Sequence, residues 1–253
     1  MTTSSRLDCL ASSIIGVIDL RGGRAVHAIA GHRDQYRDVV ASCIADGDAI
    51  GLAMRYRQLG ISSLYIADLD AINRQSPNMS LVHSLTRLAK TILIDAGPFA
   101  ASIAKTIPAT AVVRFILPTE SFSSIDEWAK AAEQFDSQQV VMGLDLCGNQ
   151  VCLRDNKAMA TTQSADLLEN VTPWIARAIA IGVTAIVVLD LSYVGTSRGA
   201  GTTLACHAIA RHWPGIELIS GGGVRDSADV QSLLDSGCDQ VLVATALHND
   251  GFA

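Results

Sequence analysis

The chain has 253 residues, of which 49% are hydrophobic, and its 19 Lys and Arg against 25 Asp and Glu give a formal net charge of −6. This length is usual for one α/β barrel, so we expect a single domain over residues 1–253. The sequence has no run of Lys or Arg, which excludes the usual nucleic-acid and anionic-membrane surfaces, but backbone N–H groups can still bind a phosphorylated small molecule.

Short runs rich in β-branched residues alternate with longer amphipathic segments along the chain. The pattern predicts strands at 14–19, 63–68, 91–95, 111–117, 139–145, 184–190, 216–220 and 239–244. Apolar residues spaced three and four apart predict helices at 48–60, 123–135, 165–182 and 227–237. Because the strands are apolar on both faces, they indicate a parallel sheet covered by helices. Eight such strands in this length favour a closed (β/α)₈ (TIM) barrel over an open doubly wound sheet.

The second half of the chain repeats phrases of the first half. GVIDLRGGRAV (16–26) resembles GLDLCGNQV (143–151), and Asp19 and Asp145 lie 126 positions apart. LIDAGPFAAS and IADLDA of the first half correspond in the same order to LISGGGVRDS and VLDLSY of the second. The repeats predict that two half-barrels, at about 14–135 and 139–253, form the barrel.

Asp19, Asp68, Asp145 and Asp190 end the first, second, fifth and sixth predicted strands. Reacting groups of these barrels lie at the carboxyl ends of the strands. Asp19 and Asp145, on the first and fifth strands, are expected to face each other across the barrel mouth. A strand-terminal Asp can instead cap its loop by accepting backbone N–H groups, and this alternative is strongest for Asp68 and Asp190.

The seventh predicted strand runs into three glycines, Gly221, Gly222 and Gly223, and the eighth is followed by Ala244 and Thr245. Glycines let the backbone approach an oxyanion closely, and barrels often bind phosphate at these two loops. We therefore predict a phosphate site here, with a tight structural turn as the alternative. The matching position after the third and fourth strands keeps only Gly97, and Pro98 and Pro118 each remove a donor N–H, so this second cradle is expected to be degraded.

Several motifs together resemble one known family. They are VIDLRGGRAV after the first strand, ADLDA after the second, GLDLCGNQV after the fifth, VGT (194–196) after the sixth and SGGGVRD after the seventh. In this combination they resemble the histidine-biosynthesis barrels of the HisA/HisF type over essentially the whole chain, and most closely the isomerase branch, the phosphoribosylformimino-aminoimidazole-carboxamide ribotide isomerases.

The resemblance implies an Amadori rearrangement that converts a phosphorylated aminoaldose into an aminoketose without a metal or an organic cofactor. It implies that Asp19 is the general base for the C2 proton and that Asp145 is the general acid that opens the sugar ring. Such assistance is worth ~10²–10⁴ per step. The resemblance also makes four further residues candidates for substrate contacts: Asp68, Asp190, Gly195 and Thr196. Scattered histidines and cysteines without ligand spacing give no reason to expect a metal.

The sequence departs from the isomerase pattern at residues that grip the substrate. Leu189 replaces a threonine, Val194 an aspartate and His27 an arginine, and Ala244–Thr245 replaces a Gly–Arg or Gly–Ser pair. A divergent paralogue is therefore an alternative, acting on a smaller, singly phosphorylated substrate in methanopterin-linked one-carbon metabolism. A protein that binds a phosphorylated ligand without catalysis is a further alternative.

Two expectations concern the whole chain. The six cysteines at positions 9, 43, 147, 152, 206 and 238 are expected to be reduced, and the chain, which has no signal-peptide pattern and no membrane-length apolar run, is expected to be cytoplasmic. Only about ten residues follow the eighth strand, so the last helix is expected to be truncated. We expect either segment 1–13 or a second copy in a homodimer to cover this strand.

Overall fold

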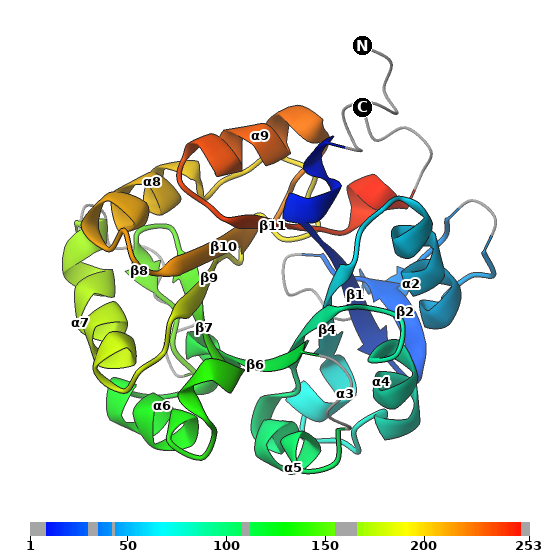
Figure 1. Ribbon diagram of the computed structural model, residues 1–253, viewed down its shortest axis with the longest axis horizontal. Coiled ribbons are helices and arrows are strands. Elements are labelled where there is room, and N and C mark those ends of the chain that lie inside the picture. The colour runs from blue at the N-terminus through cyan, green and yellow to red at the C-terminus, as the bar shows by residue number, and fades with distance from the viewer. Residues whose placement is uncertain (1–8, 30–34, 42–43, 108–111, 155–165, 249–253) are drawn as a thin grey trace.

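The computed structural model describes residues 9–29, 35–41, 44–107, 112–154 and 166–248. Eight parallel strands form a closed barrel, because β11 pairs with β1 as well as with β10. Looking down the barrel, the strands form the inner ring and helices the outer ring (Figure 1). The barrel strands are β1 (Ile14–Arg21), β4 (Ser63–Asp68), β5 (Thr91–Asp95), β6 (Val112–Pro118), β7 (Val140–Cys147), β9 (Ala185–Asp190), β10 (Glu217–Gly221) and β11 (Gln240–Val243). The predicted (β/α)₈ barrel is confirmed.

Each predicted strand is found, with its ends shifted by two residues at most. The four predicted helices are also found, as α2 (Ala49–Gln58), α6 (Ile125–Ala132), α7 (Leu167–Ala180) and α9 (Ser227–Asp235). Asp48, Ser124, Asp166 and Asp226 cap their N-termini, each accepting a backbone N–H within the first turn. Within the described part of the chain, four further α-helices were not predicted, and three of them are short: α3 (Leu69–Ile72), α4 (Met79–Leu85), α5 (Ala100–Ala104) and α8 (Thr203–His212).

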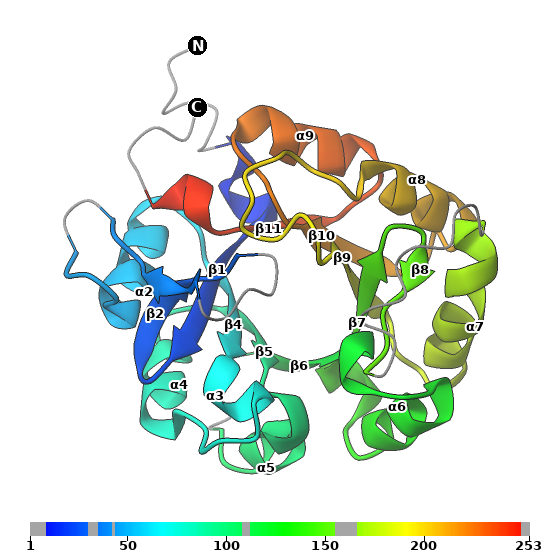
Figure 2. The same cartoon turned by 180° about the vertical axis from the view of Figure 1, so that it is seen from behind.

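Two hairpins extend the first and fifth barrel strands beyond the rim. β1 turns back into β2 (Arg24–His27), which pairs with β3 (Arg37–Asp38), and β7 turns back into β8 (Gln150–Val151). Both hairpins are visible on the face seen in Figure 2. The glycines of the two related phrases, Gly22 and Gly148, have positive φ at these turns (58° and 66°), which explains the pattern of an aspartate followed by a glycine turn.

Buried residues form two layers. One cluster lies between the strands and the helices, and includes Trp128, Tyr56 and Leu52. The other cluster fills the barrel and takes alternate residues of the strands, such as Ile15, Leu93 and Val141. The half-barrel repeat is not tested by this arrangement and stays a prediction.

The outer face of β11 is covered within the chain. Val241 and Val243 are fully buried, in the same cluster as Ala11 of the short turn η1 (Ala11–Ser13) and Leu247 of η6 (Thr245–Leu247). Both views show these two segments beside β11 (Figures 1 and 2). Within the described residues η6 is the last element, and the rest of the expected covering segment, residues 1–8, lies outside them. The homodimer stays a prediction.

Candidate functional site

The side chains of Asp19 and Asp145 face the inside of the barrel. Alternate strand residues face in and out, and Asp19 shares its side with Ile15, as Asp145 does with Val141, both members of the interior cluster. Both aspartates line one cavity of about 570 Å³ at the carboxyl ends of the strands. We call it the central cavity. The structure thus brings the two predicted acid/base residues to one space.

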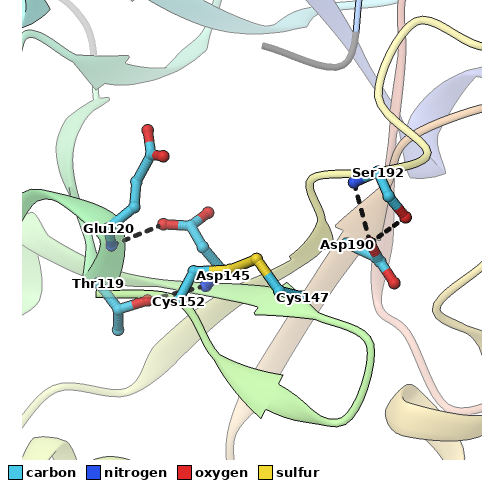
Figure 3. Close-up of a disulfide and its surroundings, with 7 residues drawn as sticks. All are labelled: Thr119, Glu120, Asp145, Cys147, Cys152, Asp190 and Ser192. Atoms are coloured by element: carbon cyan, nitrogen blue, oxygen red, sulfur yellow. Dashed lines mark hydrogen bonds between the residues drawn. A yellow bond between two sulfur atoms is a disulfide. The ribbon is translucent and has the colours of Figure 1, made fainter. Parts of the chain in front are cut away.

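Asp145 is held by the turn that follows β6 (Figure 3). Its Oδ2 accepts a hydrogen bond from the backbone N–H of Glu120 at 3.2 Å, and its own N–H donates to Oγ1 of Thr119 at 3.0 Å. Thr119 is fully buried, and the carboxyl of Asp145 is itself buried. The turn η4 (Thr119–Ser121) therefore fixes the position of this carboxyl.

Asp19 lies in a less polar environment. Within the described residues its carboxyl makes no hydrogen bond, and it also lines a second, smaller pocket with Val17, Ile18 and Val26. Burial raises the pKa of Asp19 from 3.8 to about 7. A carboxyl with this pKa is a stronger base than an ordinary aspartate and is suited to exchange protons near neutral pH.

Asp68 and Asp190 are not brought to the cavity. Both belong to the strand face that packs against the helices, as their neighbours Ile66 and Val188 do. Asp68 is fully buried and caps α3, accepting from the N–H of Ala71 (3.1 Å) and from the N–H and Nδ2 of Asn78 (2.7 and 3.0 Å).

Asp190 likewise folds back onto its own turn, where its Oδ1 accepts from the N–H and the hydroxyl of Ser192 at 2.9 and 2.6 Å (Figure 3). These contacts favour the alternative that both carboxyls anchor loops over the prediction that they contact the substrate. The alternating direction of strand side chains turns these two carboxyls outward, and they anchor loops.

The predicted phosphate residues lie around the second pocket, of about 120 Å³. Gly222, Gly223, Ala244, Thr245 and Gly195 line it. Gly222 and Gly223 have φ of +87° and +77°, a backbone form that favours glycine. Two further residues of the predicted phosphate site lie next to these in the sequence, and their contacts are with other parts of the protein.

The first of these is Gly221, where a Cβ would lie 2.5 Å from the carbonyl oxygen of Leu242. The second is Thr196, whose hydroxyl donates to the carbonyl oxygen of Tyr193. We call the pocket itself the glycine pocket.

Two histidines contribute polar groups to the glycine pocket, and sequence reasoning missed the second, His248. His27 of β2, which the sequence marks as a departure from the isomerase pattern, forms a hydrogen bond of 3.1 Å with Thr245 between Nε2 and Oγ1, which joins the loops after β1 and β11. His248 also lines the pocket and bonds to the hydroxyl of Tyr56 at 3.2 Å. Burial, with the nearby His27 and Arg55, lowers the pKa of His248 to about 4, so this imidazole is neutral at pH 7.

The cradle expected to be degraded, after β5 and β6, lies beside a different pocket of about 420 Å³. Gly97 lines it together with Pro98 and Pro118, and two arginines, Arg74 and Arg154, also line it. Arg154 forms an ion pair with Glu127. The sequence interpretation considered only backbone donors at this position and missed these side chains, which come from other loops.

Two further carboxylates line the central cavity. Asp95 ends β5 and faces inward, as Leu93 does two residues earlier, and Glu120 lies on the turn after β6. Asp95 is buried, and one of its oxygens accepts from the N–H of Gly97 at 3.1 Å. The rule that selected the other strand-terminal aspartates could have found Asp95, but DAGPFA had been interpreted only as a residual cradle.

A disulfide joins Cys147 and Cys152 across the β7–β8 hairpin, with 5.8 Å between their Cα atoms (Figure 3). The expectation that all six cysteines are reduced is therefore wrong for this pair. The antiparallel turn at Gly148 brings the end of β7 beside the residue after β8, and the N–H of Cys152 donates to the carbonyl oxygen of Asp145 at 2.7 Å. Sequence spacing gave no sign of this because the pair forms only when the hairpin closes.

Among the described residues, no group of three or more His, Cys, Asp or Glu is arranged to hold a metal ion. None of the helices found in the same residues combines the length and apolarity that crossing a bilayer would need.

The chain is similar in sequence to several known proteins. A family model described as "Histidine biosynthesis protein" matches residues 13–253. An uncharacterized protein of Methanocaldococcus jannaschii is 27% identical over 237 residues, 93% of this chain and 92% of the relative. Proteins named as phosphoribosyl imidazole-4-carboxamide isomerases are similar too, with 27% identity in Deinococcus radiodurans (93% of each chain) and 25% in Edwardsiella ictaluri (95% of each chain).

Proposed function

The chain belongs to the histidine biosynthesis protein family, and from this premise we propose that it is an isomerase that converts a phosphorylated aminoaldose into an aminoketose. Relatives named as isomerases support the reaction class. The observation that carries the proposal is that Asp19 and Asp145, from strands on opposite sides of the barrel, line one cavity beside the glycine pocket.

In the proposed reaction the two carboxyls move protons in opposite directions. Asp145 donates a proton to the ring oxygen, the ring opens, and the C1–N bond becomes an iminium. Asp19 then removes the C2 proton, and the C2–H electrons form the C1=C2 bond of the enolamine while the iminium nitrogen takes back its electron pair. Protonation at C1 and loss of the C2 hydroxyl proton then give the aminoketose. The raised pKa of Asp19 supports its role as base, because the conjugate base of an acid with a pKa of about 7 accepts a proton more readily than an ordinary aspartate.

The glycine pocket is proposed to bind the substrate phosphate. Gly222 and Gly223 keep this backbone free of side chains, while Thr245 and His27 supply a hydroxyl and an imidazole beside it. A phosphate bound here would position the attached sugar relative to the carboxyls of Asp19 and Asp145, and such positioning lowers the entropic cost of the reaction.

The test uses Asp19→Asn and Asp145→Asn with the phosphoribosyl imidazole-carboxamide substrate after which the relatives are named. We expect each variant to lose about 10²–10⁴-fold in kcat while the Kd for substrate changes little. In the wild type, kcat/KM should rise with pH through an apparent pKa near 7, because only ionised Asp19 is a base. Normal kcat in both variants would refute the roles of these two carboxyls, whereas binding of the substrate without turnover by the wild type would support the alternative of a phosphate-ligand binding protein without catalysis.

A second candidate is a divergent paralogue that acts on a smaller, singly phosphorylated substrate, of the kind found in methanopterin-linked one-carbon metabolism. It is favoured by Asp95 and Glu120, two acidic side chains that line the central cavity, and by His27 in the glycine pocket. Rescue of a bacterial strain lacking the histidine-pathway isomerase separates the two. Growth without histidine supports the pathway enzyme, and failure by a well-expressed protein supports the paralogue.

A further inference from the structure

The disulfide of the β7–β8 hairpin lies at the candidate site. Cys147 follows Asp145 by two residues on the same face of β7, and both residues line the central cavity. Figure 3 shows the disulfide beside Asp145. None of the free cysteines that the structure describes lines the central cavity or the glycine pocket: Cys9, Cys206 and Cys238. The bonded pair is therefore placed where its redox state can act on the site.

The two cysteines of the pair differ in access. Cys152 is buried, with 2% of its surface exposed, whereas Cys147 is partly exposed and lines the cavity. Thiol–disulfide exchange begins when a thiolate attacks an accessible sulfur of the pair, and exposed disulfides are the labile ones. A cavity of about 570 Å³ has room for a small thiol. The placement therefore predicts attack at Cys147, with the sulfur of Cys152 as the leaving group.

The disulfide also secures the backbone of Asp145. The N–H of Cys152 donates to the carbonyl oxygen of Asp145 at 2.7 Å, and the N–H of Asp145 donates to Oγ1 of Thr119 at 3.0 Å. The peptide groups on both sides of this residue are thus held, one by the turn after β6 and the other by the hairpin. The hairpin ladder pairs two residues on each side. Without the covalent bond, this short ladder alone would keep Cys152 beside Asp145.

We propose that Cys147 and Cys152 form a thiol–disulfide exchange site, which small thiols reach through the central cavity and which controls the position of Asp145. The disulfide form holds Asp145 for catalysis, and the dithiol form catalyses less well. The effect on turnover rests on the proposed isomerase reaction, whereas the exchange and its effect on the hairpin do not.

The exchange passes two electrons from the small thiol to the protein. The thiolate RS⁻ attacks Sγ of Cys147, the disulfide bond breaks, and its electron pair leaves with Sγ of Cys152, which takes up a proton. A second RS⁻ attacks the R sulfur of the mixed disulfide and releases the Cys147 thiolate, which is protonated in turn. Two RSH and the protein disulfide thus give RSSR and two protein thiols. The small disulfide RSSR reverses both steps.

The first measurement distinguishes an exchange site from a purely structural disulfide. The oxidised full-length protein is treated with β-mercaptoethanol and quenched in acid, and its cysteine peptides are quantified by mass spectrometry. We expect reduction at a rate that is proportional to thiol concentration and unchanged by urea below the unfolding transition, with the mixed disulfide on Cys147. A structural disulfide would instead be reduced at a rate that rises with urea as global unfolding does.

The second measurement follows the effect of reduction on the site. Amide hydrogen exchange should rise at Glu120, whose N–H donates to the Asp145 carboxyl, as well as in β8, but not in β4. The kcat/KM for the isomerase substrate should fall by about tenfold, because a small misplacement of a reacting group costs up to ~10²-fold.

Variants separate the redox state from the reagent. Cys147→Ser with Cys152→Ser should match the reduced wild type in kcat/KM and in hydrogen exchange at Glu120, and it should not respond to thiol. Cys9→Ser removes an exposed free cysteine and should keep the full redox response of the wild type. Far-ultraviolet circular dichroism and thermal melts confirm that each variant is folded.

The outcomes separate this inference from the proposed function. Reduction that requires unfolding would refute the exchange site. Native reduction that changes neither kcat/KM nor hydrogen exchange at Glu120 would refute the control of Asp145. In both cases the isomerase proposal stands if the oxidised protein turns over the substrate. If neither form turns it over, the proposed function fails, and the reduction kinetics and the hydrogen exchange at Glu120 still decide the exchange site.

Discussion

The carboxyl of Asp19 lies in the mainly apolar glycine pocket, and this environment sets its protonation equilibrium. Without a hydrogen-bond partner among the described residues, its ionised form is poorly solvated, and this raises its pKa to about 7. The same burial that makes Asp19 a useful base makes it a source of instability once it is ionised. Catalytic residues often have this double effect.

This double effect gives a prediction for Asp19→Asn. Between pH 4 and 7 the folded protein binds the extra proton and the unfolded protein does not, so stability falls as pH rises through this window. The shift of about 3 pKa units corresponds to at most about 4 kcal/mol at 1.36 kcal/mol per unit. Only the part between pH 5 and pH 7 separates the two measurements, so we expect Asp19→Asn to gain about 2–3 kcal/mol over wild type at pH 8 relative to their difference at pH 5.

Urea unfolding at the two pH values measures the effect. Asp126→Asn serves as the control, because it removes the same charge from an exposed position and should show no such dependence. A stability difference between wild type and Asp19→Asn that is equal at pH 5 and pH 8 would contradict the raised pKa.

At the scale of elements, the β7–β8 hairpin connects the fifth barrel strand to the cavity rim. Cys147 lines the central cavity two residues after Asp145, and the disulfide ties it to Cys152. The hairpin itself has only two paired residues on each side, so the covalent link contributes a large part of what closes it.

Replacing the disulfide by Cys147→Ser with Cys152→Ser should lower the free energy of unfolding by about 2 kcal/mol, the loop-closure value for a loop of this size. Amide hydrogen exchange should rise in β8 and at Cys152 but not in β4, on the other side of the barrel. Cys206→Ser, at a buried free cysteine, provides a matched comparison.

Thiol titration with Ellman's reagent gives an independent count for the wild type. Under denaturing conditions, prior reduction should add two reactive thiols. If reduction adds none, the cysteines are not paired and the account of this hairpin is wrong.

At the scale of the whole molecule, the two ends of the barrel have different tasks. The carboxyl end holds the cavity, while near the other end Arg114 of β6 and Glu217 of β10 form an ion pair of 2.8 Å across the interior. Among the residues that the structure describes, the Nε of Arg114 is buried without a partner, and the ion pair with Glu217 compensates the guanidinium charge. Barrels generally separate stability and activity in this way.

Glu217→Gln should therefore lower the free energy of unfolding by about 1–3 kcal/mol, because a buried charge loses its partner. The kcat for the isomerase substrate should stay within a factor of two, since the change is at the end of the barrel away from Asp19 and Asp145. Denaturant melts and steady-state kinetics on the same preparation check both values. A large loss of kcat with unchanged stability would contradict the separation of the two ends.

The sequence alone determined the eight strands, the barrel class and the aspartates that end the strands, because these follow from local periodicity and composition. It did not determine which strand-terminal carboxyls enter the cavity. The strands are apolar on both faces, so only closure of the barrel shows that Asp19, Asp95 and Asp145 face inward while Asp68 and Asp190 face the helices. Glu120 and the Cys147–Cys152 pair likewise depend on how loops fold back over the rim, where residues distant in sequence meet and no periodicity specifies the contact.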